Sequence, residues 1–164
     1  MVVAFVGHRT IENYEVVKER LTEVVIALIE NESADTFMFG SVGDFSLLCY
    51  EVVSELREKY PHIRRVYVRA EYDVISEDGI KYFYSHYEDM FFSDKVLRAG
   101  ARSYVVRNQV MVDMCDVLVT HCDVNYQPPR KTKSGTQMAV AYALKKNKRV
   151  INIKYNYRHY LDFC

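Results

Sequence analysis

Short apolar runs alternate with longer stretches of helical periodicity along most of the chain, and this alternation constrains the fold most. Continuous apolar runs, expected for strands covered on both faces, predict five strands at 2–6, 36–39, 65–69, 116–120 and 149–153. Apolar residues at helical spacing predict four helices at 15–29, 45–60, 104–114 and 135–147. The order predicts an α/β, Rossmann-like, three-layer domain with a mainly parallel sheet of five or more strands.

Residues 70–103 do not follow this alternation. The segment is polar, acidic and rich in tyrosine, with a turn at 76–79 and a short helix predicted at 80–90. It leaves the sheet edge at which the strands end, so two interpretations are open. It folds over a ligand as a lid, or it only covers a face of the sheet.

Composition limits the classes of protein to which the chain can belong. Its 164 residues predict one domain, 1–164, and 22 basic against 22 acidic residues argue against binding of duplex nucleic acid. No apolar run reaches the ~20 residues that span a bilayer, and no signal peptide is evident. We therefore expect a cytoplasmic protein with no membrane partner, and a homo-oligomer remains open.

The cysteines do not predict a metal site. The chain has four, at 49, 115, 122 and 164, and no pair has C-x-x-C spacing. Cys49 and Cys115 are expected to be buried and to behave as small hydrophobic residues.

The first candidate site residues follow the first strand. Gly7 permits a tight turn, His8 can form hydrogen bonds, and Arg9 can pair with a phosphate in a bidentate manner. Right-handed crossovers place the carboxyl ends of parallel strands at one edge of the sheet, where ligands bind in such folds. A solvated arginine is the alternative interpretation of Arg9.

A second glycine turn follows the second strand and opens a helix. Gly40 and Gly43 give the backbone room near a ligand, and Ser41 lies between them. Asp44 either caps the helix or binds a ribose hydroxyl, and capping is favoured. The spacing differs from both the G-x-G-x-x-G fingerprint and the P-loop.

Two further groups complete the candidate ligand site. Arg107 and Asn108 open a helix, where an arginine needs an anionic partner. A basic turn then leads into the last helix, where unpaired N–H groups and the positive end of the helix dipole favour phosphate. This turn contributes Lys133, Ser134, Gly135 and Thr136.

These pieces together resemble the SLOG superfamily, which joins the Smf/DprA proteins to the LOG (lysine-decarboxylase-like) proteins, and most of all its YpsA-like branch. The matching segments lie between residues 3 and 153, at 6–9, 39–44, 107–113, 116–118, 134–136 and 141–143. The resemblance implies a Rossmann-like fold that binds a nucleotide or a nucleotide-derived, ADP-ribose-like ligand. No other cofactor is predicted.

One position departs from the enzymes of that superfamily. LOG-type phosphoribohydrolases resemble the pattern P-G-G-x-G-T-x-x-E, and here Ala139 stands at the position of the glutamate. A methyl group cannot act as acid or base, so binding is favoured over catalysis. The alternatives are an N-glycosidic bond hydrolase or nucleobase transferase, with a carboxylate from Asp44, Glu71 or Asp73, and a single-stranded nucleic-acid binder.

Overall fold

The computed structural model describes residues 1–40, 43–70, 75–128 and 134–155. It shows six parallel strands in the order β4-β3-β2-β1-β5-β6. The strands are β1 (Val2–Gly7), β2 (Thr36–Phe39), β3 (Arg64–Val68), β4 (Asp89–Phe91), β5 (Val117–His121) and β6 (Arg149–Asn152). The helices are α1 (Tyr14–Glu32), α2 (Asp44–Lys59), α3 (Glu77–His86), α4 (Asp94–Leu97), η1 (Gly100–Arg102), α5 (Ser103–Met114) and α6 (Gly135–Lys145).

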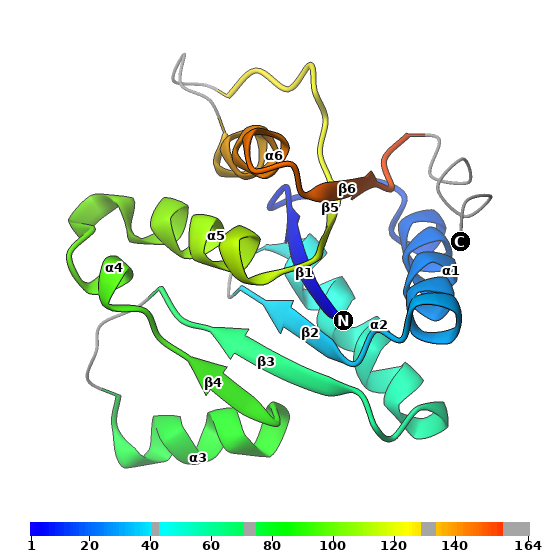
Figure 1. Ribbon diagram of the computed structural model, residues 1–164, viewed down its shortest axis with the longest axis horizontal. Coiled ribbons are helices and arrows are strands. Elements are labelled where there is room, and N and C mark those ends of the chain that lie inside the picture. Colours follow the sequence, from blue (N-terminus) through cyan, green and yellow to red (C-terminus); the bar gives the residue numbers. More distant parts are fainter. Residues whose placement is uncertain (41–42, 71–74, 129–133, 156–164) are drawn as a thin grey trace.

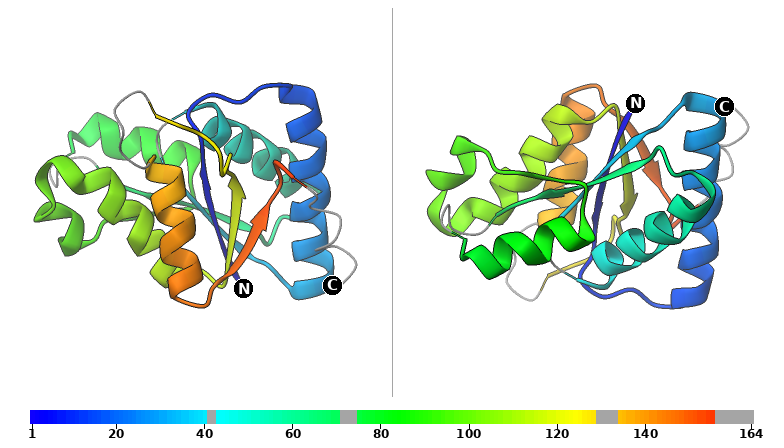
Figure 2. Two further views of the ribbon diagram at one scale, coloured as in Figure 1. Left: turned by 90° about the horizontal axis from the view of Figure 1, so that it is seen from above. Right: turned by 90° about the horizontal axis from the view of Figure 1, so that it is seen from below.

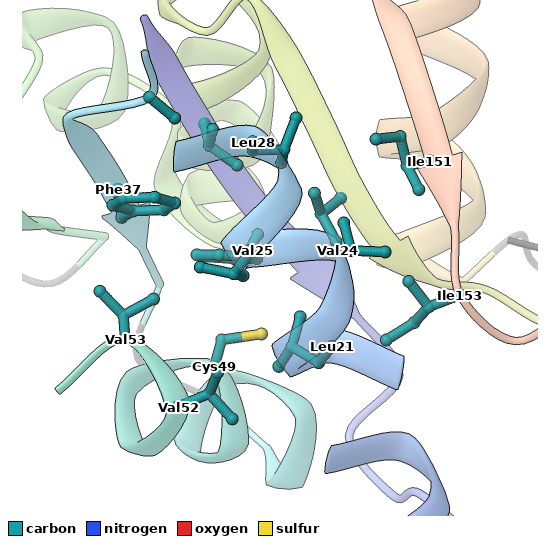
Figure 3. Close-up of a cluster of buried hydrophobic side chains, with 14 of the residues drawn as sticks. Leu21, Val24, Val25, Leu28, Phe37, Cys49, Val52, Val53, Ile151 and Ile153 are labelled. Carbon is teal, nitrogen blue, oxygen red and sulfur yellow. The ribbon is translucent and has the colours of Figure 1, made fainter. Parts of the chain in front are cut away.

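Helices cover both faces of the sheet, which explains the continuous apolar strands (Figures 1 and 2). On one face α1 and α2 pack against the strands; Figure 3 shows Leu21, Leu28, Phe37, Cys49 and Val52 in this core. On the other face α5 and α6 bury a smaller cluster. The predicted α/β, Rossmann-like fold with three layers is confirmed.

The order in which strands are added to the sheet reverses at the central strand, β1. From β1 the chain builds β2 and β3 on one side, then returns to add β5 and β6 on the other. The registers of β1 with both neighbours are parallel, and Gly7 lies opposite His121. The ends of β1 and β5 therefore form the switch point at which α/β sheets bind ligands.

The nine predicted elements are all present, with ends that differ from the prediction by at most three residues. The segment 70–103 differs more, because it adds β4, a sixth strand that the sequence did not predict, to the edge of the sheet. Its described part also forms α3, which begins and ends earlier than the helix predicted at 80–90. Tyr67 of β3 stacks on Phe83 of α3 with ring centroids 4.5 Å apart, so α3 covers the α2 face of the sheet.

No helix among the described residues is both long and apolar enough to cross a membrane.

A partly buried ion pair holds the added strand. The Nη2 and Nε atoms of Arg65, on β3, donate to the two carboxylate oxygens of Glu88 at 2.8 and 3.1 Å. The Arg65 guanidinium also donates to Ser54 of α2 at 2.9 Å. Asp89 meets Arg64 at 3.2 Å, but both of these side chains are about half exposed.

We predict that Glu88→Gln lowers the free energy of unfolding by about 1–3 kcal/mol, because it weakens charged hydrogen bonds in a partly buried site. The matched variant Asp89→Asn should cost less than about 1 kcal/mol, because water screens an exposed pair. Urea unfolding of both variants measures this difference. Equal losses would contradict the assignment of Glu88 as the residue that anchors β4.

Candidate functional site

A cavity of about 590 Å³ lies at the switch point of the sheet. Residues that follow β1, β5 and β6 form its wall, together with parts of α5 and the first turn of α6. The lining consists of Gly7, His8, Arg9, Thr10, Glu12, Tyr104, Arg107, Asn108, His121, Asp123, Tyr126, Pro128, Ser134, Gly135, Thr136 and Lys154. This volume is in the range of pockets that bind small molecules.

The start of α2 holds the loop that carries Arg9. The backbone N–H of Asp44 donates to the carbonyl of Arg9 at 2.7 Å, and the Asp44 carboxylate accepts from the N–H of Ile11 at 3.4 Å. The favoured role of Asp44 as a cap is wrong, because the N-cap residue is Gly43 and no side chain caps α2. Gly43 has φ +97°, and a Cβ there would collide with the backbone of Arg9.

Side chains of the protein pack closely against the glycines at the ends of β1 and β2. A Cβ on Gly7 would overlap the ring of Phe45, and a Cβ on Gly40 would overlap the guanidinium of Arg107. We expected Gly7 to permit a tight turn and Gly40 to give a ligand room near the backbone. In the structure, side chains of α2 and α5 occupy the space beside these glycines.

Arg107 lies in the second turn of α5, further from the helix start than predicted. Its side chain lines the cavity although the residue is only 5% exposed. Nη1 donates to the carbonyl of Val68 at 3.1 Å, and Nε donates to Oδ1 of Asn108 at 2.9 Å. The guanidinium also lies 5.7 Å from the centroid of the Tyr104 ring. These contacts fix the cation at the wall of the cavity.

The start of α6 remains open to the cavity. Ser134 and Gln137 form a capping box, in which the Ser134 hydroxyl accepts from the N–H of Gln137 at 3.1 Å. That box leaves the N–H groups of Gly135 and Thr136 for another partner. A Cβ on Gly135 would meet no atom within 4 Å, so the backbone there can be approached closely.

The His8 ring is fixed by the loop after β5. The backbone N–H of Asp123 donates to Nε2 of His8 at 2.9 Å, and Tyr126 packs on the ring at 4.7 Å between centroids. Because Nε2 accepts this bond, the proton of the neutral ring is on Nδ1. Burial lowers the pKa of His8, the Lys154 charge adds to this effect, and Asp123 opposes it.

His121, the last residue of β5, is 6% exposed and lines the cavity beside Phe45. Its Nδ1 atom is buried and has no hydrogen-bond partner among the described residues. Burial lowers the pKa of His121 to about 4, and the positive charge of Lys154 acts in the same direction. His121 is therefore a neutral imidazole at pH 7.

Charges of both signs surround these rings. Arg9, Arg107 and Lys154 line the cavity, as do Glu12 and Asp123. The amine of Lys154 lies 3.6 Å from the Asp123 carboxylate. The N–H of Asn125 lowers the pKa of Asp123, the Tyr155 hydroxyl and Lys154 add to this effect, and burial opposes it. In the described part of the chain, no three His, Cys, Asp or Glu side chains are grouped to hold a metal ion.

The structure brings together most of the predicted site residues. Eight of them line the cavity: Gly7, His8, Arg9, Arg107, Asn108, Ser134, Gly135 and Thr136. Gly40, Gly43 and Asp44 lie outside the lining and support Arg9 or Arg107 from behind, so a ligand contact for them stays a prediction. Ser41 and Lys133 lie outside the described residues.

Sequence reasoning missed several residues of the lining, among them His121, Asp123 and Lys154. These three follow or end the strands predicted at 116–120 and 149–153. The rule that selected Gly7, namely that ligands bind where parallel strands end, applies equally to them. The position of these residues at strand ends was therefore a sufficient signal, although the prediction used it only where a glycine or a basic turn was also present.

The buried His121 predicts a stability that depends on pH. Its pKa of about 4 in the folded protein is below the usual 6.5, so between these values the unfolded chain binds more protons. Stability should therefore fall as the pH is lowered from about 6.5 towards 4. We expect His121→Phe to remove about 1 kcal/mol of the loss between pH 7 and pH 5. Urea unfolding at both pH values measures this, and equal losses in both proteins would contradict it.

Comparison with known proteins identifies the fold and no family. No family model matches the sequence, and no curated protein matches it. Among solved structures, the molybdenum cofactor carrier protein from Chlamydomonas reinhardtii is similar, with a TM-score of 0.53 and 21% sequence identity. The match covers 91% of this chain and 73% of the other. At this level of identity, the similarity shows that the two proteins share an α/β fold.

Proposed function

We propose that this chain binds a phosphate-bearing nucleotide, or a nucleotide-derived ligand of the ADP-ribose type, and that its role is sensing or regulatory. The observation that carries the proposal is the open start of α6 inside the cavity at the switch point of the sheet. Membership of the SLOG superfamily, in its YpsA-like branch, is part of the same proposal.

The start of α6 has the features of a phosphate site. The N–H groups of Gly135 and Thr136 have no partner in the capping box, and the helix dipole favours negative charge there. Arg9, Arg107 and Lys154 add positive charge to the same cavity. Lys154 also pairs with the Asp123 carboxylate at 3.6 Å.

The start of α2 is built differently, although it lies at the same edge of the sheet. The N–H of Asp44 is taken by the Arg9 carbonyl, and Gly43 packs on the backbone of Arg9. This helix start therefore supports the loop after β1. A single phosphate subsite, at α6, follows from the comparison of the two helices.

Hydrolysis by the LOG mechanism has no support in the cavity. Ala139 is 1% exposed and packs in the core formed with α5, away from the lining. Of the alternative carboxylates, Asp44 lies outside the lining, and Glu71 and Asp73 are outside the described residues. Two other carboxylates, Glu12 and Asp123, line the cavity. The lowered pKa of Asp123 keeps it ionised, which suits a general base but not a general acid.

A small molecule fits the cavity better than a nucleic-acid strand. Its volume of about 590 Å³ suits one nucleotide-sized ligand, whereas strand binding uses a long basic groove with stacking surfaces. The molybdenum cofactor, which the similar structure carries according to its name, is a second small ligand to test.

We predict that millimolar ADP or ADP-ribose raises the melting temperature of the protein. Selective binding to the folded state stabilises it by about 2.7 kcal/mol at a hundredfold excess over Kd. Gly135→Val should abolish this shift, because a branched side chain would block the N–H groups at the start of α6. Differential scanning fluorimetry measures both effects.

Ala141→Val is the matched control for this experiment. Ala141 is exposed on the same helix and is absent from the cavity lining. This variant should keep the ligand-induced shift, and both valine variants should melt near the wild type without ligand. A Gly135→Val protein that binds as the wild type does would move the phosphate subsite away from α6.

We predict no appreciable phosphoribohydrolase activity on AMP. Loss of a general acid or base typically slows a reaction by ~10²–10⁴-fold, and Ala139 supplies neither. Adenine release is measured by chromatography after incubation with purified protein. Turnover near ~10 per second, an ordinary enzyme rate, would show that another group catalyses the reaction and would favour the hydrolase alternative.

A further inference from the structure

His121 has an unusual place for a polar side chain. It ends β5, lines the cavity, and is 6% exposed, yet its buried Nδ1 has no hydrogen-bond partner among the described residues. Leaving a buried polar atom without a partner is unfavourable for folding, and such atoms are rare in proteins. An apolar side chain would pack beside Phe45 without this cost. The described residues supply no partner for this atom, and the ring lines the cavity.

His8 presents a defined donor in the same cavity. The bond from the N–H of Asp123 to Nε2 directs the proton to Nδ1, as described above. The contact with Tyr126 restrains the ring further. His8 follows β1, and His121 ends the neighbouring strand β5. The backbone N–H of His8 donates to the backbone carbonyl of His121 at 3.2 Å. Two imidazoles therefore line the cavity. In His8 the donor atom is Nδ1, and in His121 the Nδ1 atom has no hydrogen-bond partner among the described residues.

The surroundings of the two rings do not suit an anion. Both imidazoles are neutral at pH 7, because burial disfavours the charged form. The Asp123 carboxylate next to His8 is paired with the Lys154 amine at 3.6 Å, so the two charges beside the rings offset each other. An uncharged group with both donor and acceptor atoms, such as the edge of a heterocyclic base or a sugar hydroxyl, pairs well with neutral imidazoles.

We propose that His8 and His121 bind an uncharged polar group of the ligand, while its phosphate binds at the start of α6. The cavity then selects molecules in which a phosphate is joined to a base or sugar and discriminates against a phosphate alone. This inference rests on the proposed function, because it needs the phosphate subsite. It adds a specificity subsite formed by two histidines.

The test compares three probes by titration calorimetry: inorganic pyrophosphate, ribose 5-phosphate and ADP. The wild type should bind ADP more tightly than pyrophosphate. His121→Phe should weaken ADP binding about tenfold, the loss of one hydrogen bond, and leave pyrophosphate affinity unchanged. If the two histidines bind the sugar, His121→Phe should bind ribose 5-phosphate more weakly than the wild type does, as it does ADP. If they bind the base, His121→Phe and the wild type should bind ribose 5-phosphate equally well.

Two further variants separate binding from folding. His121→Asn keeps a polar group near the position of Nδ1 and should retain more ADP affinity than His121→Phe. His62→Phe changes an exposed histidine far from the lining and should leave ADP affinity unchanged. His121→Phe should also unfold at a urea concentration equal to or above that of the wild type, because it removes the unpartnered atom.

The outcomes are distinguishable. Equal loss of pyrophosphate and ADP affinity in His121→Phe would show a general disturbance of the cavity and overturn the specificity subsite. Unchanged ADP affinity in that variant would overturn it as well, while the phosphate subsite stands. If the wild type binds none of the three probes, the proposed function fails and the inference fails with it.

Discussion

The packing of Phe45 on Gly7 joins the first turn of α2 to the end of the central strand, and the geometry of the cavity depends on it. The ring occupies the space that any side chain at position 7 would need. It also lies 5.9 Å from the His121 ring, measured between centroids. The same turn of α2 holds the Arg9 carbonyl through the N–H of Asp44. One helix start therefore sets the position of the cation after β1 and of the imidazole that ends β5.

The two helix starts at this edge show how local chemistry assigns different roles to similar sequences. Each has a glycine at its start, Gly43 as the N-cap of α2 and Gly135 as the first residue of α6, and both have the unpaired N–H groups common to every helix. At α2 the polypeptide itself supplies the acceptor. At α6 a capping box supplies acceptors for the N–H groups of Ser134 and Gln137, and a Cβ on Gly135 would meet no atom within 4 Å. The proposed phosphate subsite therefore rests on which N–H groups the fold has already used.

The structure describes most of segment 70–103, for which the sequence allowed either a lid over a ligand or a cover for one face of the sheet. Its described residues extend the sheet through β4 and cover a face through α3, and none of residues 75–103 lines the cavity. This favours the covering role over the lid. The Arg65–Glu88 pair explains the arrangement, since it joins β3 to the residue before β4 in a partly buried site.

The sequence by itself determined the class of fold and the edge of the sheet at which the cavity lies. Continuous apolar strands between amphipathic helices require a covered parallel sheet, and the ends of such strands meet at one edge. The Ser-Gly-Thr turn identified Gly135 from a local pattern, whereas the need for glycine at position 7 comes from the Phe45 ring, which is distant in the sequence. Only the tertiary structure decided that Asp44 supports a loop, that Arg107 is held by the Val68 carbonyl, and that Nδ1 of His121 has no hydrogen-bond partner among the described residues. Those properties depend on atoms from residues distant in the chain, and the spacing of residues in a sequence carries no record of such contacts.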